Sequence, residues 1–404
     1  GDWSSDVCSS DLNGAPQSMS RQFFRWSDLA FASIILLTLP MGVSAEEPKI
    51  EHVTDFVNDQ PAGIAVTDEG RVFVTFPRHT GTVDFTVGEV KKGKTTAFPT
   101  TESNTPKSND PTSTLFSVQS LVVDGANRLW MLDTGVMQVG GTPVTGAPKL
   151  VVVDLTTNKV MRAYTIPANV LVTKSALKDF RLDFSRSAAG TAFVTDSAPG
   201  AEALIVFDLG SGTAMRRLSG SGVVGPGSGQ APIVEGAPLM VRPKNGEAHP
   251  FAVGLNGVEL SLDSQTLYFN AFTGRRLYSL PTRAAADPSI TEEDLVKQVR
   301  EPCDMTIAGH LAIDARGRIY AMDMEHNAIL RKDPEGDFQP FVTSNMFIWP
   351  DTMAIGPDDK LYITSSQHDR GPLFHGGIDQ RKRPFVLYRV SIGAGPVRAG
   401  RHSL

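Results

Sequence analysis

The pattern of hydrophobic and polar positions along the chain repeats six times. Each copy has alternating apolar residues, an Asp-x-x-Gly or Asp-x-x-Asn turn, and a second apolar run that usually contains an aromatic residue. The copies lie at 63–74, 121–133, 180–196, 258–270, 311–323 and 353–365. Period-two alternation on both sides of a turn predicts a β-hairpin in each copy. Six such units, roughly 40–80 residues apart, predict a six-bladed β-propeller.

A second hairpin is expected outside the first in most units. Apolar runs of this kind occur at 149–164 and 203–218, and shorter ones at 276–280, 328–331 and 385–390. Two hairpins in each unit predict four-stranded antiparallel blades, so the fold class is all-β. The one segment with a helical pattern is 289–299, which begins with Thr291 and three acidic residues.

Three long insertions separate these hairpins. They span 100–114, 220–250 and 367–384, and they are rich in Gly, Pro, Ser, Thr, Asn or basic residues. Long connections in a compact fold commonly carry function. We therefore expect them on the faces of the blades, where loops can border a binding site.

The N-terminal segment is predicted not to be part of the folded domain. Residues 1–18 resemble a translated sequencing adapter and are interpreted as an artefact. Residues 19–45 have the features of a signal peptide: two Arg, a short apolar run and Val43-Ser44-Ala45 as a cleavage site. The remaining residues, 46–404, are expected to form one propeller domain that is secreted or periplasmic. The alternative is an uncleaved membrane anchor.

Charge and cysteine content restrict the partners. The formal net charge is −6, of which residues 1–45 contribute −2. Such mild acidity gives no electrostatic reason to expect nucleic acid or an anionic membrane as a partner. No stable membrane insertion is expected after signal cleavage. A monomer that binds a small molecule is expected. Cys303 is the single thiol of the predicted mature chain and is interpreted as buried and unreactive rather than nucleophilic.

Propeller geometry predicts which residues surround the mouth of the central channel. The innermost strand of each blade starts at one face beside the channel, and its partner strand returns to that face. Polar residues before the first strand and after the second therefore share one rim. The residues before the first strand are Gln60, Gln119, Asp179, Asn256, His310 and Asp351. The residues after the second strand are Asp133, Asp196, Asn270, Asp323 and Ser365.

The two sets differ in how easily they can be explained without a ligand. An Asp after an inner strand often caps a neighbouring turn, which would account for Asp133, Asp196 and Asp323. Turn capping explains the residues before the first strand less well. For them, the alternative to a catalytic role is a site that holds ordered water in the channel. The residues expected to bind ligand are Gln119, Asn256, Asn270, Asp196 and Asp323.

A proton-transfer reaction would need a base at this rim. His310 is expected to be the general base, because the ordinary pKa of histidine is close to neutral. Asp179 or Asp351 would orient the substrate. The sequence has no Ser/His/Asp spacing signature, no His-x-His pair and no phosphate-binding Gly-rich loop that opens a helix.

Several segments around these positions resemble the Yellow and major royal jelly protein family, in its bacterial branch. The resemblance lies in 117–135 (SVQSLVVDGANRLWMLDTG), 148–155 (PKLVVVDL) and 162–167 (RAYTIP), with further matches at 193–197 and 267–269. It covers most of 50–392 and implies a six-bladed propeller. It also implies either conversion of dopachrome-like catechol derivatives or capture of small aromatic amines in the channel.

The repeat is also similar, more distantly, to that of gluconolactonase-like calcium propellers. This resemblance implies a divalent cation held by oxygen ligands, with Asn256 and Asp351 as candidate ligands. Gln60 offers only an amide where an acidic ligand would be expected in the first blade. Three functions thus remain open: tautomerisation of a small cyclic or aromatic molecule, calcium-dependent lactone hydrolysis, and ligand binding without catalysis. No cofactor is expected, except calcium under the second function.

Overall fold

The structure, a computed structural model, describes residues 48–78, 82–138, 140–227 and 231–400. The chain divides into two compact units, Gly1–Glu46 and Glu47–Leu404. The predicted artefact and signal peptide lie outside the described residues. The second unit contains the repeats and is described by itself below.

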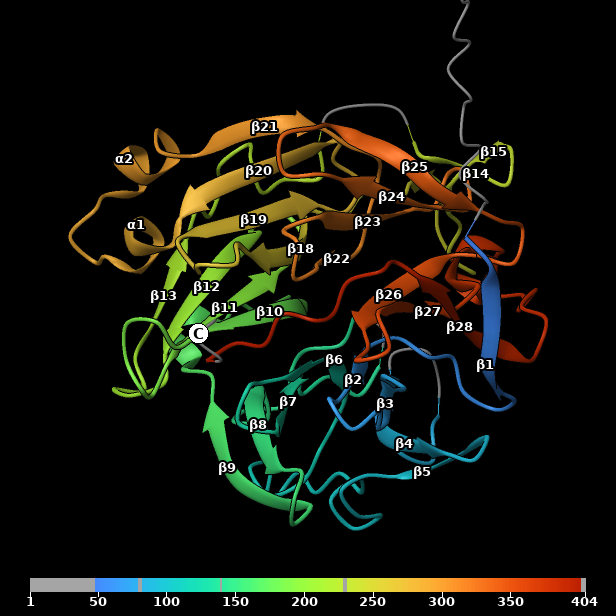
Figure 1. Cartoon of the computed structure of the whole chain (residues 1–404), viewed down its shortest axis with the longest axis horizontal. Coiled ribbons are helices and arrows are strands. Elements are labelled where there is room, and N and C mark those ends of the chain that lie inside the picture. The colour runs from blue at the N-terminus through green and yellow to red at the C-terminus, as the bar shows by residue number, and fades with distance from the viewer. Residues whose placement is uncertain (1–47, 79–81, 139, 228–230, 401–404) are drawn as a thin grey trace, which may run out of the picture. The chain divides into compact units, whose positions relative to one another are not determined.

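Six four-stranded antiparallel sheets form the blades of a β-propeller, as the repeats predicted (Figure 1). The innermost strands contact one another in a closed ring, in the order β2, β6, β10, β18, β22 and β26. From the innermost strand outward, blade 1 contains β2 (Ile64–Val66), β3 (Val72–Thr75), β4 (Val87–Lys91) and β5 (Lys94–Ala97). Blade 2 contains β6 (Val118–Val123), β7 (Arg128–Asp133), β8 (Lys149–Asp154) and β9 (Lys159–Thr165). Blade 3 contains β10 (Leu177–Asp183), β11 (Thr191–Asp196), β12 (Ala203–Asp208) and β13 (Ala214–Arg217). Blade 4 contains β18 (Leu255–Leu260), β19 (Thr266–Ala271), β20 (Arg276–Pro281) and β21 (Arg300–Asp304). Blade 5 contains β22 (Leu311–Ile313), β23 (Ile319–Asp323), β24 (Ala328–Lys332) and β25 (Phe338–Thr343). Blade 6 contains β26 (Pro350–Ile355), β27 (Lys360–Ser365), β28 (Phe385–Ser391) and β1 (Ile50–Phe56).

The last blade closes the ring with a strand from the start of the domain. β1 pairs antiparallel with β28, so Ile50 lies opposite Val390 and Phe56 opposite Phe385. Glu51 on β1 also forms ion pairs with Lys360 and with an arginine of β28. The first and last parts of the domain are thereby held in one sheet.

The Asp of the repeated pattern explains why an Arg and an aromatic residue follow it at fixed positions. In the second blade, Asp124 Oδ1 accepts hydrogen bonds from the backbone N–H groups of Ala126 and Arg128, at 2.9 and 3.1 Å. Asp124 Oδ2 accepts from Arg128 Nε and from Trp130 Nε1. Asp314 makes the equivalent bonds in the fifth blade, with Tyr320 as the aromatic donor. One carboxylate thus fixes the turn, the Arg and the aromatic residue together.

The hydrophobic core consists of separate clusters between neighbouring blades. The blade 2–3 cluster contains Trp130, Leu150, Phe180 and Phe207, all at most 1% exposed. Equivalent clusters fill the remaining five interfaces. Because each blade is packed on both faces, its strands are mostly apolar rather than strictly alternating.

The insertions carry more regular structure than the sequence indicated. The predicted loop 220–250 contains two short hairpins. β14 (Ile233–Val234) pairs with β15 (Ala237–Pro238), and β16 (Met240–Val241) pairs with β17 (His249–Pro250). The 367–384 insertion contains the 3-10 helices η3 (His368–Arg370) and η4 (Pro372–Phe374), and η2 (Ala168–Val170) follows β9. Val234 and Leu239 of the 220–250 insertion and Phe374 of the 367–384 insertion belong to a seventh hydrophobic cluster, which also contains Phe272, Ile307, Met324 and Trp349.

Two short α-helices precede β21. α2 (Glu292–Val296) lies within the predicted helical segment and begins at Thr291, whose hydroxyl accepts from the Asp294 backbone N–H. α1 (Thr282–Ala286) was not predicted, because five residues are too few to show a helical period. The described part of the chain has no helix with the length and apolar composition needed to cross a membrane. Cys303 is buried at 8% exposure, as expected, and burial raises the pKa of its thiol.

Candidate functional site

Four of the six innermost strands are irregular where they reach the channel mouth. Their pairing register slips in β6, β10, β18 and β26. A β-bulge interrupts strict alternation and can redirect side chains. The residues within these slips that line the mouth are Gln119, Lys178, Asp179, Asn256, Asp351 and Thr352. Bulges therefore position several functional groups that regular strands would not bring to one place.

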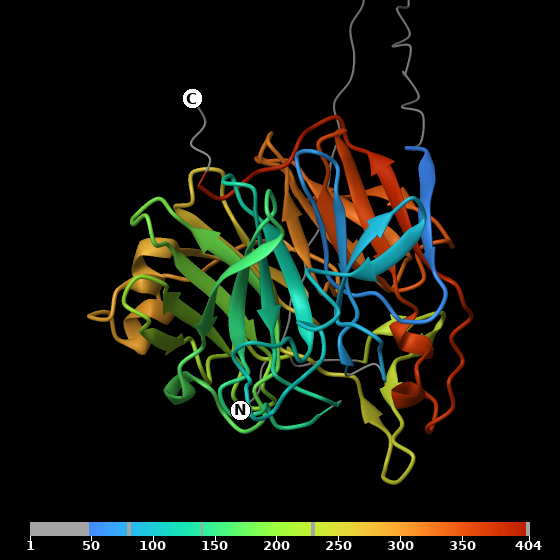
Figure 2. The same ribbon diagram turned by 90° about the horizontal axis from the view of Figure 1, so that it is seen from below.

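These residues line one cavity of about 810 Å³. All six residues predicted before the first strands line it: Gln60, Gln119, Asp179, Asn256, His310 and Asp351. Four of them lie inside an innermost strand rather than before it, because the strand continues through the bulge. The 220–250 and 367–384 insertions lie on one face of the propeller and the C-terminal segment on the opposite face (Figure 2). Gly371, Pro372 and Leu373 of the second insertion line the cavity, which places it on the face of the insertions.

Aromatic side chains form one wall of the cavity. Phe251, Phe272 and Trp349 line it, and the rings of Phe272 and Trp349 stack with centroids 5.8 Å apart. Phe251 packs edge-on against both, at 5.5 and 6.1 Å. His368 lies 5.5 Å from Trp349 and also lines the cavity. Such a wall suits the face or edge of a planar ligand.

The backbone beside this wall is strained at two residues. Trp349 has φ of 50° and Gln367 has φ of 52°, in the left-handed region that bulky residues rarely adopt. The two segments are held together because the backbone N–H groups of Ser366 and Gln367 donate to the carbonyls of Trp349 and Ile348, each at 3.1 Å. Strain of this kind is concentrated at functional sites, where the surroundings enforce it.

Asp351 is the carboxyl group of the cavity whose protonation is most altered. Burial raises its pKa to about 6, against the opposing effects of the Ser366 hydroxyl and the Lys178 charge. Burial lowers the pKa of Lys178, while Asp351 and Asp196 oppose this change. Burial, followed by the charges of Lys178 and Arg381, lowers the pKa of His368 to about 4. Acid and base groups in one cavity are thus shifted toward their neutral forms.

His310 and Asp179 meet deeper in the channel. His310 Nε2 is 3.5 Å from Asp179 Oδ2 and 3.4 Å from an Arg181 nitrogen. Asp179 Oδ1 accepts from Ser120 Oγ at 2.7 Å and from Arg181 at 3.0 Å. Burial lowers the pKa of His310 to about 4, with Asp179 opposing this and Arg181 adding to it. His310 is therefore neutral at pH 7 and is a weaker base than its ordinary pKa implied.

The residues predicted after the second strands do not line this cavity, and their polar atoms serve local structure. Asp133 Oδ1 accepts from the backbone N–H of Ser117 at 2.9 Å, and its Oδ2 forms an ion pair with Lys149 Nζ at 2.8 Å. Asp196 accepts from Ser175, Ala176, Ala198 and Arg216. The Asn270 side-chain amide donates to the carbonyls of Ala271 and Ala308. The Asp323 carboxylate accepts from the backbone N–H of Glu325 and bonds the ring of His326. The Ser365 hydroxyl donates to the carbonyls of Met346 and Ile348. The capping interpretation thus accounts for Asp133, Asp196 and Asp323.

A calcium site of the expected kind needs several oxygen ligands in one place. Asn256 and Asp351 do line the same cavity. Within the described ranges, however, no three or more His, Cys, Asp or Glu side chains are grouped so that they could hold a metal ion. Calcium can also take oxygen ligands from amides and backbone carbonyls, so the calcium site implied by the gluconolactonase resemblance stays a prediction.

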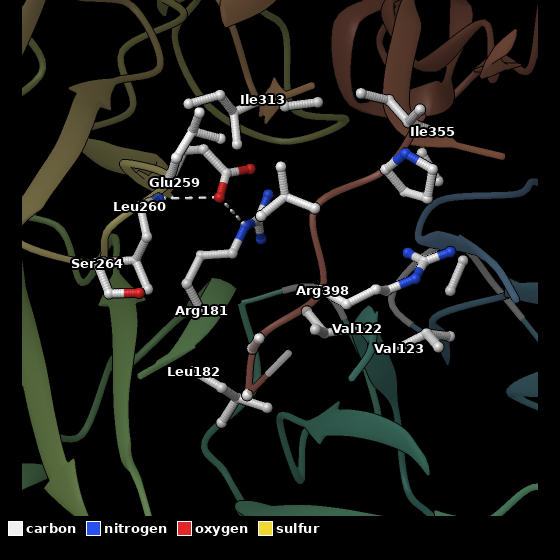
Figure 3. Close-up of a pocket in the computed structure, with 18 of the residues that line it drawn as sticks. Val122, Val123, Arg181, Leu182, Glu259, Leu260, Ser264, Ile313, Ile355 and Arg398 are labelled. Atoms are coloured by element: carbon white, nitrogen blue, oxygen red, sulfur yellow. Dashed lines mark hydrogen bonds and ion pairs between the residues drawn. The ribbon is translucent and has the colours of Figure 1, made fainter. Parts of the chain in front are cut away.

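The other mouth of the channel is separated from the cavity by charged side chains and covered by the C-terminal segment. Arg181 Nε of β10 pairs with Glu259 of the neighbouring innermost strand β18 at 2.9 Å (Figure 3). Beyond this pair a second, smaller cavity of about 290 Å³ is lined by residues of several innermost strands and by 396–400. Arg398 of this segment bonds Asp68 and the Val66 carbonyl, at 3.1 and 2.7 Å.

The chain can now be compared with known proteins. A family model described as "Major royal jelly protein" matches residues 116–391. The chain belongs to the major royal jelly protein family. Major royal jelly protein 1 of Apis mellifera is 25% identical over 251 residues, which are 60% of this chain and 54% of that protein. Protein yellow of Drosophila melanogaster is 30% identical over 122 residues, 28% of this chain and 22% of that protein.

The matched segments span about half of Major royal jelly protein 1 and less than a quarter of Protein yellow. Solved structures support the propeller fold of this major royal jelly protein family member. A luciferin-regenerating enzyme has a TM-score of 0.50 at 13% identity and covers 88% of this chain and 100% of its own. Regucalcin from Agrobacterium tumefaciens has the same score and identity and covers 87% and 98%. At this identity the likeness concerns the fold alone.

Sequence reasoning missed several residues of the cavity. Lys178 was not identified because simple alternation places neighbouring residues on opposite faces, whereas the bulge lets both Lys178 and Asp179 line the cavity. Phe251, Trp349 and His368 come from segments between the repeats, where no period locates a side chain. Only His368 lies within one of the predicted insertions, 367–384; Phe251 follows the 220–250 insertion directly, and no signal was available for Trp349.

Proposed function

We propose that this major royal jelly protein family member binds a small planar, cyclic or aromatic molecule in the larger cavity and catalyses its isomerisation by proton transfer. The observation that supports this most directly is the meeting of an aromatic wall with Asp351 in one cavity. The wall supplies a surface for a planar ring, and Asp351 supplies a carboxyl group that exchanges a proton near neutral pH.

In the proposed reaction, the ligand lies against Phe272 and Trp349. The Asp351 carboxylate removes a proton from carbon or oxygen at one position, and the resulting acid returns it at another. The product is an isomer of the substrate, so no oxidant or cofactor is consumed. Neutral His310 donates or accepts a hydrogen bond at the inner end of the cavity.

The assignment of roles differs from the expectation that His310 is the base. A base is most effective when its pKa is near the working pH, and Asp351 at about 6 meets this condition better than His310 at about 4. Asp179 is engaged by Ser120 and Arg181 and is proposed to position His310.

The test is a screen of catechol-derived quinones and cyclic enones with the full chain, followed by absorbance. Trp349 fluorescence would report binding separately from turnover. We expect Asp351→Asn to lower kcat by about 10²–10⁴-fold, the usual contribution of a general base, while binding persists. Unchanged kcat in this variant would reject the proposed base. Binding without any product, also in the unaltered protein, would favour a non-catalytic binding protein.

Calcium titration of the same protein separates the lactonase alternative. Lactone hydrolysis that is lost with a chelator, is restored by calcium and is absent in Asn256→Ala would replace the isomerase proposal. Export of the chain likewise remains a proposal from its N-terminal segment, and cell fractionation tests it.

A further inference from the structure

Lys178 is an amine in the larger cavity that the proposed reaction does not use. It lies in the bulge of β10 and lines the cavity next to Asp179. The side chain is half-buried. It forms no hydrogen bond or ion pair with any residue in the described ranges.

The fully buried lysines of the domain behave differently. Lys149 Nζ, with its side chain 1% exposed, pairs with Asp133 and donates to the carbonyls of Pro111 and Ala147. Lys332 donates to the carbonyls of Asp333 and Pro334. A buried ammonium group normally needs such partners. Lys178 is held in the cavity wall without them, which leaves its nitrogen available to a ligand.

The surroundings of Lys178 make its ammonium group easier to deprotonate than that of an exposed lysine. Burial lowers the pKa of Lys178, and the nearby Asp351 and Asp196 carboxyls oppose this change only in part. His368, also in the cavity wall, is neutral at pH 7 because burial and nearby positive charges lower its pKa to about 4. Lysines in such environments act as nucleophiles toward carbonyl groups.

We propose that Lys178 Nζ forms an imine with the carbonyl group of a bound aryl-substituted aldehyde or ketone that has a C–H next to its carbonyl carbon. The inference rests on the proposed function, since the same aromatic wall holds the ligand, and it specifies a carbonyl compound as the substrate class. It also assigns Lys178 as a catalytic residue.

The chemical step balances without an added reagent. The amine lone pair forms a C–N bond to the carbonyl carbon, and one of the two amine protons moves to the carbonyl oxygen to give a neutral carbinolamine. The Asp351 carboxyl then donates a proton to this oxygen, the C–O bond breaks and water leaves, while the nitrogen keeps its remaining proton and forms the C=N bond of a protonated imine. The protonated imine withdraws electrons, so the Asp351 carboxylate can remove a proton from a neighbouring C–H and return it at another carbon of the conjugated system. Addition of water to the C=N bond then breaks the C–N bond and releases the isomer and the free amine.

The experiment is reductive trapping with para-hydroxybenzaldehyde and cyanoborohydride on the full chain. Cyanoborohydride reduces an imine to a stable secondary amine, which intact mass and peptide mapping locate. We expect one dominant adduct, on the peptide that contains Lys178. Lys178→Arg should lose this adduct while it keeps the positive charge. Lys174→Arg is the matched control, because Lys174 lines the same cavity but is exposed, and it should label like the unaltered protein.

Two readouts separate failure of this inference from failure of the proposed function. Quenching of tryptophan fluorescence by the aldehyde, and by para-hydroxybenzyl alcohol, reports non-covalent binding to the cavity where Trp349→Phe abolishes it, because Trp130 also fluoresces. Quenching by both probes without an adduct at Lys178 overturns the imine and leaves the proposed binding site intact. Equal labelling of exposed lysines and Lys178 also overturns it. If neither probe quenches nor labels the protein, the imine and the aromatic binding site are both rejected.

Discussion

Asp351 illustrates how burial of a single carboxyl group can lower the stability of the folded protein. Burial raises its pKa from 3.8 to about 6, so the folded protein holds this proton more tightly than the unfolded chain does. The folded state therefore binds more protons between these pH values, and stability falls as pH rises through this window. Above pH 6 the full cost of the ionised carboxylate is present.

Asp351→Asn is expected to raise the free energy of unfolding at pH 7 by about 1–3 kcal/mol, from the size of the pKa difference. The gain should disappear below pH 4, where the wild-type carboxyl is protonated in both states. Urea unfolding of both proteins at pH 4 and pH 7 measures this. A variant that is more stable yet inactive is the signature of a functional group, whereas equal stability at both pH values would contradict the burial of this charge.

Lys149 shows the opposite case, in which a buried charge is fully partnered. Its side chain is 1% exposed and its Nζ lies 2.8 Å from Asp133, which is 0% exposed. Lys149→Met removes the cation and leaves the carboxylate with its backbone donors alone. We expect a loss of about 3 kcal/mol in the free energy of unfolding, measured by urea denaturation. The exposed Lys159→Met is the control and should change stability little.

At the scale of elements, the C-terminal segment ties several blades together at the far mouth of the channel. The carbonyl of Gly395 accepts from Ala315, and the carbonyl of Ala399 accepts from Gly125, at 3.0 and 2.8 Å. Arg398 adds its bonds to Asp68 and Val66 in the first blade. The segment thus contacts turns of the fifth, second and first blades.

Arg398→Ala is expected to lower the free energy of unfolding by about 1–3 kcal/mol, because hydrogen bonds that involve a charged group are lost. Amide hydrogen exchange at Gly125 and Ala315 should become faster if the segment loosens. The exposed Arg316→Ala serves as the control. Unchanged exchange in Arg398→Ala would show that the backbone bonds alone hold the segment.

At the scale of the whole domain, closure of the ring depends on contacts between its first strand and its last blade. Phe56 of β1 is 4% exposed and packs in the cluster that includes Val74, Tyr362 and Phe385. This cluster joins the first and last blades, so its loss affects the closure of the whole ring rather than one sheet.

Phe56→Ala is expected to lower the free energy of unfolding by about 3–5 kcal/mol, the usual cost of removing a buried aromatic side chain. Val57→Ala, at a neighbouring position that is 64% exposed, is the matched control. Thermal and urea unfolding of the two variants measure the difference. Similar stabilities would mean that closure of the ring does not rely on this packing.

The sequence by itself determined the fold and the approximate place of the site. Alternation and the repeated Asp turn depend only on contacts a few residues apart, such as those of Asp124 and Asp314, so they can be read along the chain. The repeat also predicted that Gln119, Asp179, Asn256 and Asp351 would face one rim, because all blades place equivalent positions at equivalent points around the ring.

The tertiary structure alone decided which groups meet and in what protonation state. The bulge that admits Lys178 arises from strand pairing, which simple alternation does not reveal. The ring of Trp349 reaches the cavity through backbone strain enforced by neighbouring segments. The pKa values of Asp351 and His310 depend on burial by residues that are distant in sequence. A local pattern therefore specified the blades, whereas the chemistry of the cavity depended on packing between them.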